Sequence, residues 1–384
     1  MEPPVAPFYL LYRTGLAPTN GTSVQVARLL AGMEDSAIHL LWDTGEAGSS
    51  SVRQSIVLQD GSRGDGMTAD ALDRESELGP WWAGEEVNRT RLRYVLESFS
   101  APATRAWMLC GNERDAARAM AIWKALDEPP LLLHVMDIFH NEVSSRVTPQ
   151  LLRLIEAANQ VACTSAAAAR EVQRHCPRQV HVLTCCSNFS AIGRRSFDAP
   201  LSIALTGTLW DKSMWNSSPA LDVFVEAWPR LKAVYPGVEL HYAGAFAQHL
   251  PAVLRDDAQN HGYLQPSECE QLLRNCHLAY LPVSLNTKFG PYSVPSRIAD
   301  YLACGLPTIT CTAPGTGIYD FVAALPQGIS ENVQTAAQLV DAVIRLGGDA
   351  RRWNEASTRA ADYAKRALHA DVIRSQLLDY LGRS

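Results

Sequence analysis

The stretch PSRIADYLACGLPTI, from Pro295 to Ile309, is the most informative part of this sequence for both fold and chemistry. Ser296 is a residue type that is favoured at the N-cap of a helix, and Gly305 is typical of a helix end. A short apolar strand follows that glycine. A helix start presents backbone N–H groups and the positive end of the helix dipole, and Arg297 adds a forked donor that matches a phosphate group. Asp300, one helical turn further on, is in place to accept the two hydroxyls of a ribose. The stretch therefore predicts a site for a nucleoside diphosphate, with an ordinary amphipathic helix and solvated Arg297 and Asp300 as the alternative.

Strands and helices alternate along the whole chain of 384 residues, a length that is typical of two domains. In the first half the pattern predicts strands at 8–12, 38–42, 107–110, 131–135, 160–164 and 180–183, and helices at 23–33, 88–99, 113–125 and 149–158. In the second half it predicts strands at 201–206, 238–242, 278–282 and 308–310, and helices at 220–234, 266–276, from 296 onward and at 351–380. The fold class is therefore α/β, with two doubly wound parallel sheets that face each other across a cleft.

Amino-acid composition and the local distribution of polar and apolar residues limit the classes to which this protein can belong. Residues 44–73 are polar and rich in glycine, serine and aspartate, which predicts an extended surface loop or weak structure. Charged residues make up 19% of the chain and the net charge is −6, which argues against a nucleic-acid partner. The nine cysteines are scattered without zinc-site spacing, and we expect them to be reduced thiols. No signal peptide is recognised and no apolar run approaches the length of a membrane span, so we predict a cytoplasmic protein.

The 295–309 stretch resembles the nucleotide-binding helix of GT-B glycosyltransferases, particularly the large family 4 of the group 1 type. The matching positions are Pro295, Ser296, Arg297, Asp300, Ala303, Gly305 and Pro307. Members often carry two glutamates eight positions apart; the second maps to Asp300 and the first to Tyr292, which has no carboxylate. Retaining or inverting stereochemistry therefore stays open.

The resemblance implies an organisation and a set of site residues. It implies a Rossmann-like acceptor domain at 1–190, a Rossmann-like nucleotide-sugar domain at 201–350, and a C-terminal helix at 351–384 that crosses back to the first domain. The residues expected to hold the donor are Gly21, Gly207, Gly290, Ser293, Ser296, Arg297 and Asp300. Those expected to take part in the chemistry are Asp137 as general base, with Arg297 and Lys212 on the leaving diphosphate. The alternatives are an N-cap of a loop turn for Asp137 and a solvated loop lysine for Lys212.

Two further positions have mainly structural interpretations. Asn188 lies in a Cys-Cys-Ser-Asn-Phe run that resembles the family's Pro-Asn-Gly hinge segment without its proline and glycine. His134 lies near the end of a predicted strand, and we expect a hydrogen-bonded histidine of the core.

Taken with the resemblance, these residues predict a hexosyltransferase that moves a sugar from a UDP- or GDP-linked donor to a glycan or glycolipid hydroxyl. The expected role is in cell-surface polysaccharide or glycoconjugate synthesis. No metal ion is expected to be required. One alternative is a degenerate GT-B protein that binds a nucleotide or sugar without turnover, which the departures at Tyr292, Thr208 and Met136 favour. A sugar-nucleotide epimerase is another. Three arginines at 89, 91 and 93 lie near Trp81 and Trp82, and they predict either peripheral contact with the inner membrane face or an ordinary solvated helix.

Overall fold

A computed structural model of the protein describes residues 6–12, 21–33, 36–41, 54–57, 103–110, 113–136, 138, 140–141, 144–145, 147–197, 200–207, 218–245, 247–283 and 291–383. It divides into two compact units. Unit 1 comprises Met1–Thr184 and Ile373–Ser384, and unit 2 comprises Cys185–Val372.

Unit 1 is built on a parallel sheet with strand order β3-β2-β1-β4-β5-β8-β9. The strands are β1 (Phe8–Leu11), β2 (Ala37–Leu41), β3 (Gln54–Val57), β4 (Ala106–Cys110), β5 (Leu131–Val135), β8 (Gln160–Cys163) and β9 (Val180–Val182). Its helices are α1 (Gly21–Leu30), α4 (Glu113–Ala125), α5 (Pro149–Ala157) and α6 (Ala166–Gln173), and a small hairpin pairs β6 (His140–Asn141) with β7 (Ser144–Ser145). The order reverses between β1 and β4, which is the arrangement of a doubly wound sheet.

Unit 2 repeats this plan with the strand order β12-β11-β10-β13-β14-β15. The strands are β10 (Ser202–Thr206), β11 (Glu239–Ala243), β12 (Ala258–Asn260), β13 (Leu278–Pro282), β14 (Thr308–Cys311) and β15 (Ser330–Val333). The helices are α7 (Ser218–Val234), η2 (Ala247–His249), α8 (Ala252–Asp257), α9 (Pro266–Arg274), α10 (Arg297–Ala303), α11 (Gly317–Ala323), α12 (Ala336–Gly347) and α13 (Ala350–Ala367). The expected α/β class with two doubly wound parallel sheets is confirmed.

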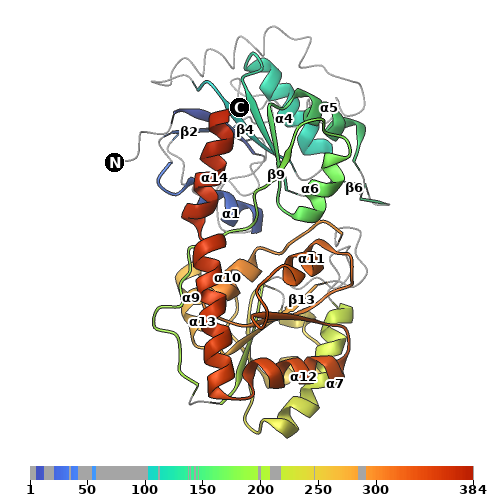
Figure 1. The fold of residues 1–384 in the computed structure, drawn as a ribbon, viewed down its shortest axis with the longest axis vertical. Helices are drawn as coiled ribbons and strands as arrows, with labels where there is room; N and C mark the ends of the chain where they lie inside the picture. Colours follow the sequence, from blue (N-terminus) through green and yellow to red (C-terminus); the bar gives the residue numbers. More distant parts are fainter. Residues whose placement is uncertain are drawn as a thin grey trace. The chain divides into compact units, whose positions relative to one another are not determined.

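Successive side chains of β10 enter two different hydrophobic clusters because a strand alternates its faces. Ile203 and Leu205 join a cluster with side chains of α7 and α12, which lie side by side in Figure 1. Ala204 joins the opposite cluster, with Ile298 and Tyr301 of α10. The sheet of unit 2 is therefore buried on both faces, which explains why its strands read as apolar runs.

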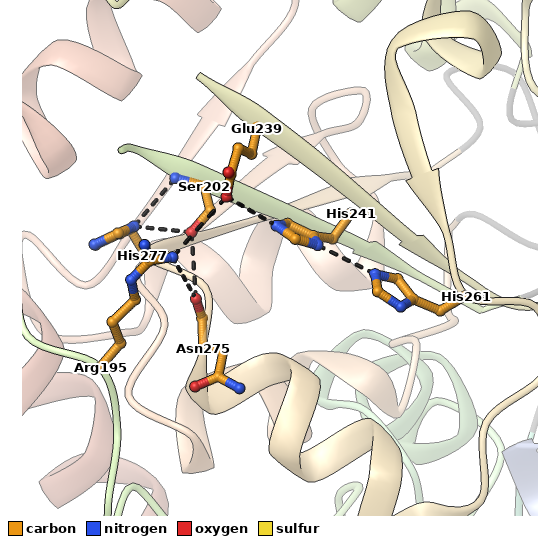
Figure 2. Close-up of polar contacts among 7 residues, drawn as sticks. All are labelled: Arg195, Ser202, Glu239, His241, His261, Asn275 and His277. Carbon is orange, nitrogen blue, oxygen red and sulfur yellow. Dashed lines mark hydrogen bonds and ion pairs between the residues drawn. The ribbon is translucent and has the colours of Figure 1, made fainter. Parts of the chain in front are cut away.

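A polar network covers the edge of this sheet where its strands begin (Figure 2). His277 Nδ1 accepts a hydrogen bond from the Ser202 backbone N–H at 3.1 Å, and the Ser202 hydroxyl lies 2.8 Å from the same nitrogen. The network also includes Arg195, Glu239, His241, His261 and Asn275. Ligands of open α/β sheets bind at the opposite edge, where strands end, so this network serves to anchor the segment around Arg195 to the sheet.

Two expectations about local structure were wrong. Residues 44–73 were expected to form an extended loop or weak structure, but β3 lies within them and pairs with β2 in parallel, because a run as short as Gln-Ser-Ile-Val gains its structure from the neighbouring strand. A single helix was expected at 351–380, but α13 ends at Ala367 and α14 (Ala370–Arg383) begins after a break. The break occurs because His369 forms a parallel bridge with Ser187.

The last residues of the chain pack on unit 1. In α14, Arg374 donates through Nε to the Leu29 carbonyl at 3.0 Å and through Nη2 to the Arg28 carbonyl at 3.0 Å, so the end of α1 receives a cation. Arg105 donates to the carbonyl of Leu381 at 2.8 Å. These bonds satisfy carbonyl groups that the ends of two helices leave unpaired.

Candidate functional site

The candidate site of unit 2 lies where β10 and β13 end. From β10 the chain proceeds outward to β11 and β12, and from β13 it proceeds outward to β14 and β15 in the other direction. The connections therefore diverge between β10 and β13, and a crevice at the carboxyl ends of such strands is the usual ligand site of an open parallel sheet.

Two glycines bring backbone against backbone at this edge. Gly207 follows β10 with φ of +99°, and Gly244 follows β11. A Cβ atom on Gly244 would lie 2.1 Å from the Gly207 carbonyl oxygen, so no larger residue fits there without a backbone shift. A Cβ atom on Gly207 would lie 2.2 Å from Arg297 Nη1, so this glycine leaves the space that the guanidinium occupies.

Arg297 is held against the end of β10. Its Nη1 donates to the Thr206 carbonyl at 2.6 Å. Among the described residues, no carboxylate forms an ion pair with it, and its buried Nε has no hydrogen-bond partner. A half-buried cation that lacks a counter-ion, with a donor left over, favours the binding of an anion at this point.

Two tyrosines surround the guanidinium. The hydroxyl of Tyr301 accepts from the Thr206 N–H at 2.9 Å and lies 2.8 Å from Thr206 Oγ1. The hydroxyl of Tyr242 donates to the Ala245 carbonyl at 2.6 Å. Burial raises the pKa of Tyr242 to about 12, and the Arg297 charge opposes that rise. Both tyrosines therefore stay neutral and leave the positive charge of Arg297 uncompensated.

Asp300 lies one turn along the same helix and is half-buried. Its Oδ1 accepts a hydrogen bond of 2.5 Å from the hydroxyl of Ser187. A carboxylate offers about four acceptor positions, and Ser187 occupies one of them.

The start of α10 differs from the N-capped helix start that the sequence predicts. Ser296 has helical dihedral angles, φ −58° and ψ −30°, and its side chain makes no capping bond, whereas Thr316, Thr335 and Asp349 cap the helices that follow. The N–H groups of Ile298 and Ala299 bond to the carbonyls of Pro295 and Ser296. The first turn is tightened in the manner of a 3₁₀-helix, which uses two of the N–H groups that we expected to face an anion.

Ser293 belongs to a segment that packs on the first residue of α11. A Cβ atom on Gly317 would lie 2.8 Å from the carbonyl oxygen of Tyr292 and 3.0 Å from that of Ser293. The hydroxyl of Thr316 accepts from the N–H of Tyr319 and so caps the same helix. The segment before α10 is thus fixed by close backbone packing against α11.

Residues 207–349 match the sequence profile of the family described as glycosyl transferases group 1. This segment is therefore similar to group 1 glycosyltransferases. It contains Gly207, Ser293, Ser296, Arg297 and Asp300, and most of unit 2. No curated protein matches the chain significantly.

Solved structures show that the whole chain has the GT-B fold. HepE from Anabaena, in complex with UDP and glucose, aligns with a TM-score of 0.66 at 14% identity over 99% of this chain and 100% of its own. Sucrose-phosphate synthase from Thermosynechococcus elongatus aligns with a TM-score of 0.67 at 13% identity over 97% of each chain. A glycosyltransferase from Rickettsia africae aligns with a TM-score of 0.67 at 12% identity over 98% of each chain.

Several predicted site residues of this GT-B protein lie outside the described residues. They are Asp137, Lys212 and Gly290. Gly21 is the first residue of α1. Their roles stay predictions.

The candidate site also includes residues that the sequence analysis missed. Gly244, Thr206, Tyr301 and Ser187 all contact the candidate site. Gly244 had a signal in the sequence, because a glycine directly after a buried strand marks a close backbone approach. Ser187 had none, since it lies 113 positions before Asp300, the residue that it contacts.

His134 of unit 1 is buried, as expected of a core position. The expectation that it would be hydrogen-bonded was wrong. Among the described residues, neither ring nitrogen has a hydrogen-bond partner, and the ring stacks on Trp107 at 6.2 Å between centroids. Burial lowers the pKa of His134 to about 4, and an interaction with the Leu183 backbone opposes that shift.

The described residues contain neither a metal-binding cluster nor a membrane-spanning helix. No group of three or more histidine, cysteine, aspartate or glutamate side chains is arranged to hold a metal ion in that part of the chain. None of the helices described is both long and apolar enough to cross a membrane.

Proposed function

We propose that the protein transfers a sugar from a nucleoside diphosphate sugar to an acceptor hydroxyl, and that unit 2 binds the nucleotide. The observation that carries the proposal is Arg297, a half-buried cation with no ion-pair partner among the described residues and with a buried, unpaired Nε, at the switch point of the sheet. The group 1 glycosyltransferase match over the same residues and the UDP-bound HepE structures support it.

In the proposed reaction, the bond between the sugar's anomeric carbon and the diphosphate oxygen breaks, and a bond from that carbon to the acceptor oxygen forms. Negative charge develops on the leaving diphosphate, and Arg297, with Lys212, stabilises that charge more strongly as the bond lengthens. Asp137 accepts the proton of the acceptor hydroxyl.

Binding of the donor uses the remaining predicted residues. Asp300 accepts hydrogen bonds from the ribose hydroxyls, while Gly207, Gly290, Ser293 and Ser296 lie along the diphosphate and sugar. Gly21 is a further proposed donor-binding residue. UDP is the first nucleotide to test because HepE was solved with UDP and with UDP-glucose.

A binding protein without turnover is the second candidate, because Tyr292 stands where a glutamate commonly faces the donor sugar. Isothermal titration calorimetry with UDP and GDP, with and without Mg²⁺, tests the shared step. If neither nucleotide binds, both candidates fail. If one binds, a screen of nucleotide sugars with that nucleotide separates transfer, free-sugar isomerisation and binding alone.

The acceptor is proposed to be a glycan or glycolipid hydroxyl of a cell-surface polymer, and the protein to be cytoplasmic with peripheral membrane contact. The arginine and tryptophan positions that predict this contact, between residues 81 and 93, lie outside the described residues. Co-sedimentation with anionic vesicles tests the contact, and protein that stays in the supernatant at low salt would exclude it.

A further inference from the structure

Ser187 lies in the segment through which the chain enters unit 2, which begins at Cys185. Its N–H donates to the Leu368 carbonyl at 2.8 Å, and its carbonyl accepts from the Ala370 N–H at 3.0 Å. Unit 2 ends at Val372, so the bridge between Ser187 and His369 joins the two segments by which the chain enters and leaves this unit. The backbone of Ser187 is therefore fixed independently of its side chain.

The hydroxyl of Ser187 is also fixed. Its Oγ accepts a hydrogen bond from the Phe189 N–H at 3.1 Å and lies 2.5 Å from Asp300 Oδ1. A hydroxyl carries one hydrogen, and the Phe189 N–H approaches an acceptor position, so the hydroxyl hydrogen points to the carboxylate. Ser187 itself is 1% exposed, which keeps water from competing for this bond.

This bond determines how the Asp300 carboxylate is presented. An aspartate at a half-buried position on a short helix samples several side-chain rotamers and a broad range of carboxylate rotation. A charge-assisted O–H···O⁻ bond at 2.5 Å holds one oxygen and leaves the plane of the group in one orientation. A pair of vicinal hydroxyls is bound best by a carboxylate whose orientation is already set, because no entropy is then lost on binding.

We propose that Ser187 is a positioning residue that orients Asp300 for the ribose hydroxyls of a nucleoside diphosphate. The proposal rests on the proposed function of unit 2. In the hinge segment that this run resembles, proline stands in place of Ser187, and proline has neither the hydroxyl that reaches Asp300 nor the N–H that reaches Leu368. The arrangement is thus a property of this chain's own sequence.

The experiment compares UDP with 2′,3′-dideoxyuridine 5′-diphosphate, which lacks both ribose hydroxyls, by calorimetry. The unaltered protein is expected to prefer UDP, and Ser187→Ala to reduce that preference about tenfold, which corresponds to about 1.4 kcal/mol, through weaker UDP binding. Affinity for the dideoxy compound stays unchanged. Ser187→Thr keeps the hydroxyl and restores much of the preference.

Ser190→Ala is the matched control. Ser190 lies in the same segment, and its hydroxyl accepts from Arg274 at 3.0 Å instead of contacting Asp300, so its loss leaves the preference for UDP intact. Ser187→Cys, which keeps the size with a weaker donor, replaces Ser187→Ala if that variant does not fold.

Two results overturn the inference alone: an unchanged preference for UDP in Ser187→Ala, or an equal loss of affinity for both compounds, which would mean that Ser187 acts through packing. If the unaltered protein binds no nucleoside diphosphate, the proposed function fails and the inference fails with it.

Discussion

The two parallel sheets share a topology but differ in what they bury near the ends of their strands. In the described part of unit 1, His134, the last residue but one of β5, buries ring nitrogens that have no partner. In unit 2 the corresponding edge holds a connected set of polar groups around Thr206, Tyr301 and Arg297. The comparison shows that a doubly wound sheet provides the place for a site, while a few side chains and glycines decide whether that place can hold a charged ligand.

The largest effect is expected at the guanidinium that distinguishes unit 2. Arg297→Ala should lower kcat about a hundredfold to a thousandfold, because the diphosphate gains negative charge as the glycosidic bond breaks. This decrease corresponds to a loss of about 3 kcal/mol of transition-state stabilisation. Arg297→Lys should recover only part, since an ammonium lacks the fork geometry. Steady-state kinetics with the donor identified by calorimetry measures this.

Arg345→Ala is the control for that experiment. Arg345 also lies in unit 2, but its guanidinium is exposed and pairs with Glu331 at 2.5 Å. The Arg345→Ala substitution should therefore leave kcat unchanged. A folded Arg297→Ala protein with full kcat would contradict the phosphate role and favour the binding-only function.

The unpaired histidine of unit 1 should make stability depend on pH. The folded-state pKa of His134 is about 4, below the value of 6.5 for a free histidine, so the unfolded chain binds the proton first. Its contribution is fully present above pH 6.5 and is lost as the pH falls from 6.5 to about 4, by about 3 kcal/mol.

His134→Leu removes this dependence and fills the same core position without an unsatisfied polar group. Urea unfolding of both proteins at pH 7 and pH 4 measures the difference, because all other titrating groups are common to both. Equal losses of stability in the two proteins would show that His134 is not buried in its neutral form.

The role of the space beside Gly207 can be tested by comparing its substitution with that of another glycine of similar backbone geometry. Gly207 and Gly237 have φ of +99° and +91°, but a Cβ atom on Gly237 meets nothing within 4 Å. Both Gly→Ala variants should lose about 1–2 kcal/mol of stability from the left-handed backbone. Only Gly207→Ala displaces Arg297, so only it should weaken UDP binding, by about tenfold.

Thermal unfolding and calorimetry on the two variants separate these effects. Equal UDP affinity in Gly207→Ala and Gly237→Ala would mean that the position of the Arg297 guanidinium does not matter for the nucleotide.

A further effect on nucleotide binding is expected at the carboxylate of unit 2. Asp300→Ala should weaken UDP binding by about 2 kcal/mol, the scale of a hydrogen bond to a charged group. Asp341→Ala, which removes an exposed carboxylate on α12, is the control and should have no effect. Calorimetry measures both, and an unchanged affinity in Asp300→Ala would show that this carboxylate does not hold the ribose.

The sequence pattern located most strands of both sheets but missed those that depend on a neighbour. β12 (Ala258–Asn260) and β3 are short and lack a strong apolar pattern, and each is formed by pairing at the edge of a sheet. The helices α6 and α12 also escaped the sequence analysis, although Ser165 and Thr335 provide N-caps that could have marked them.

The sequence by itself determined the alternation of strands and helices, and the order of Ser296, Arg297 and Asp300 along one helix, because these depend on local periodicity and on residue type. Only the tertiary structure decided that Arg297 folds back onto Thr206 in the space left by Gly207, and that Ser187 holds Asp300. Those contacts join positions more than ninety residues apart. Such pairings are set by the way strands and helices stack in the folded unit, and no local pattern encodes them.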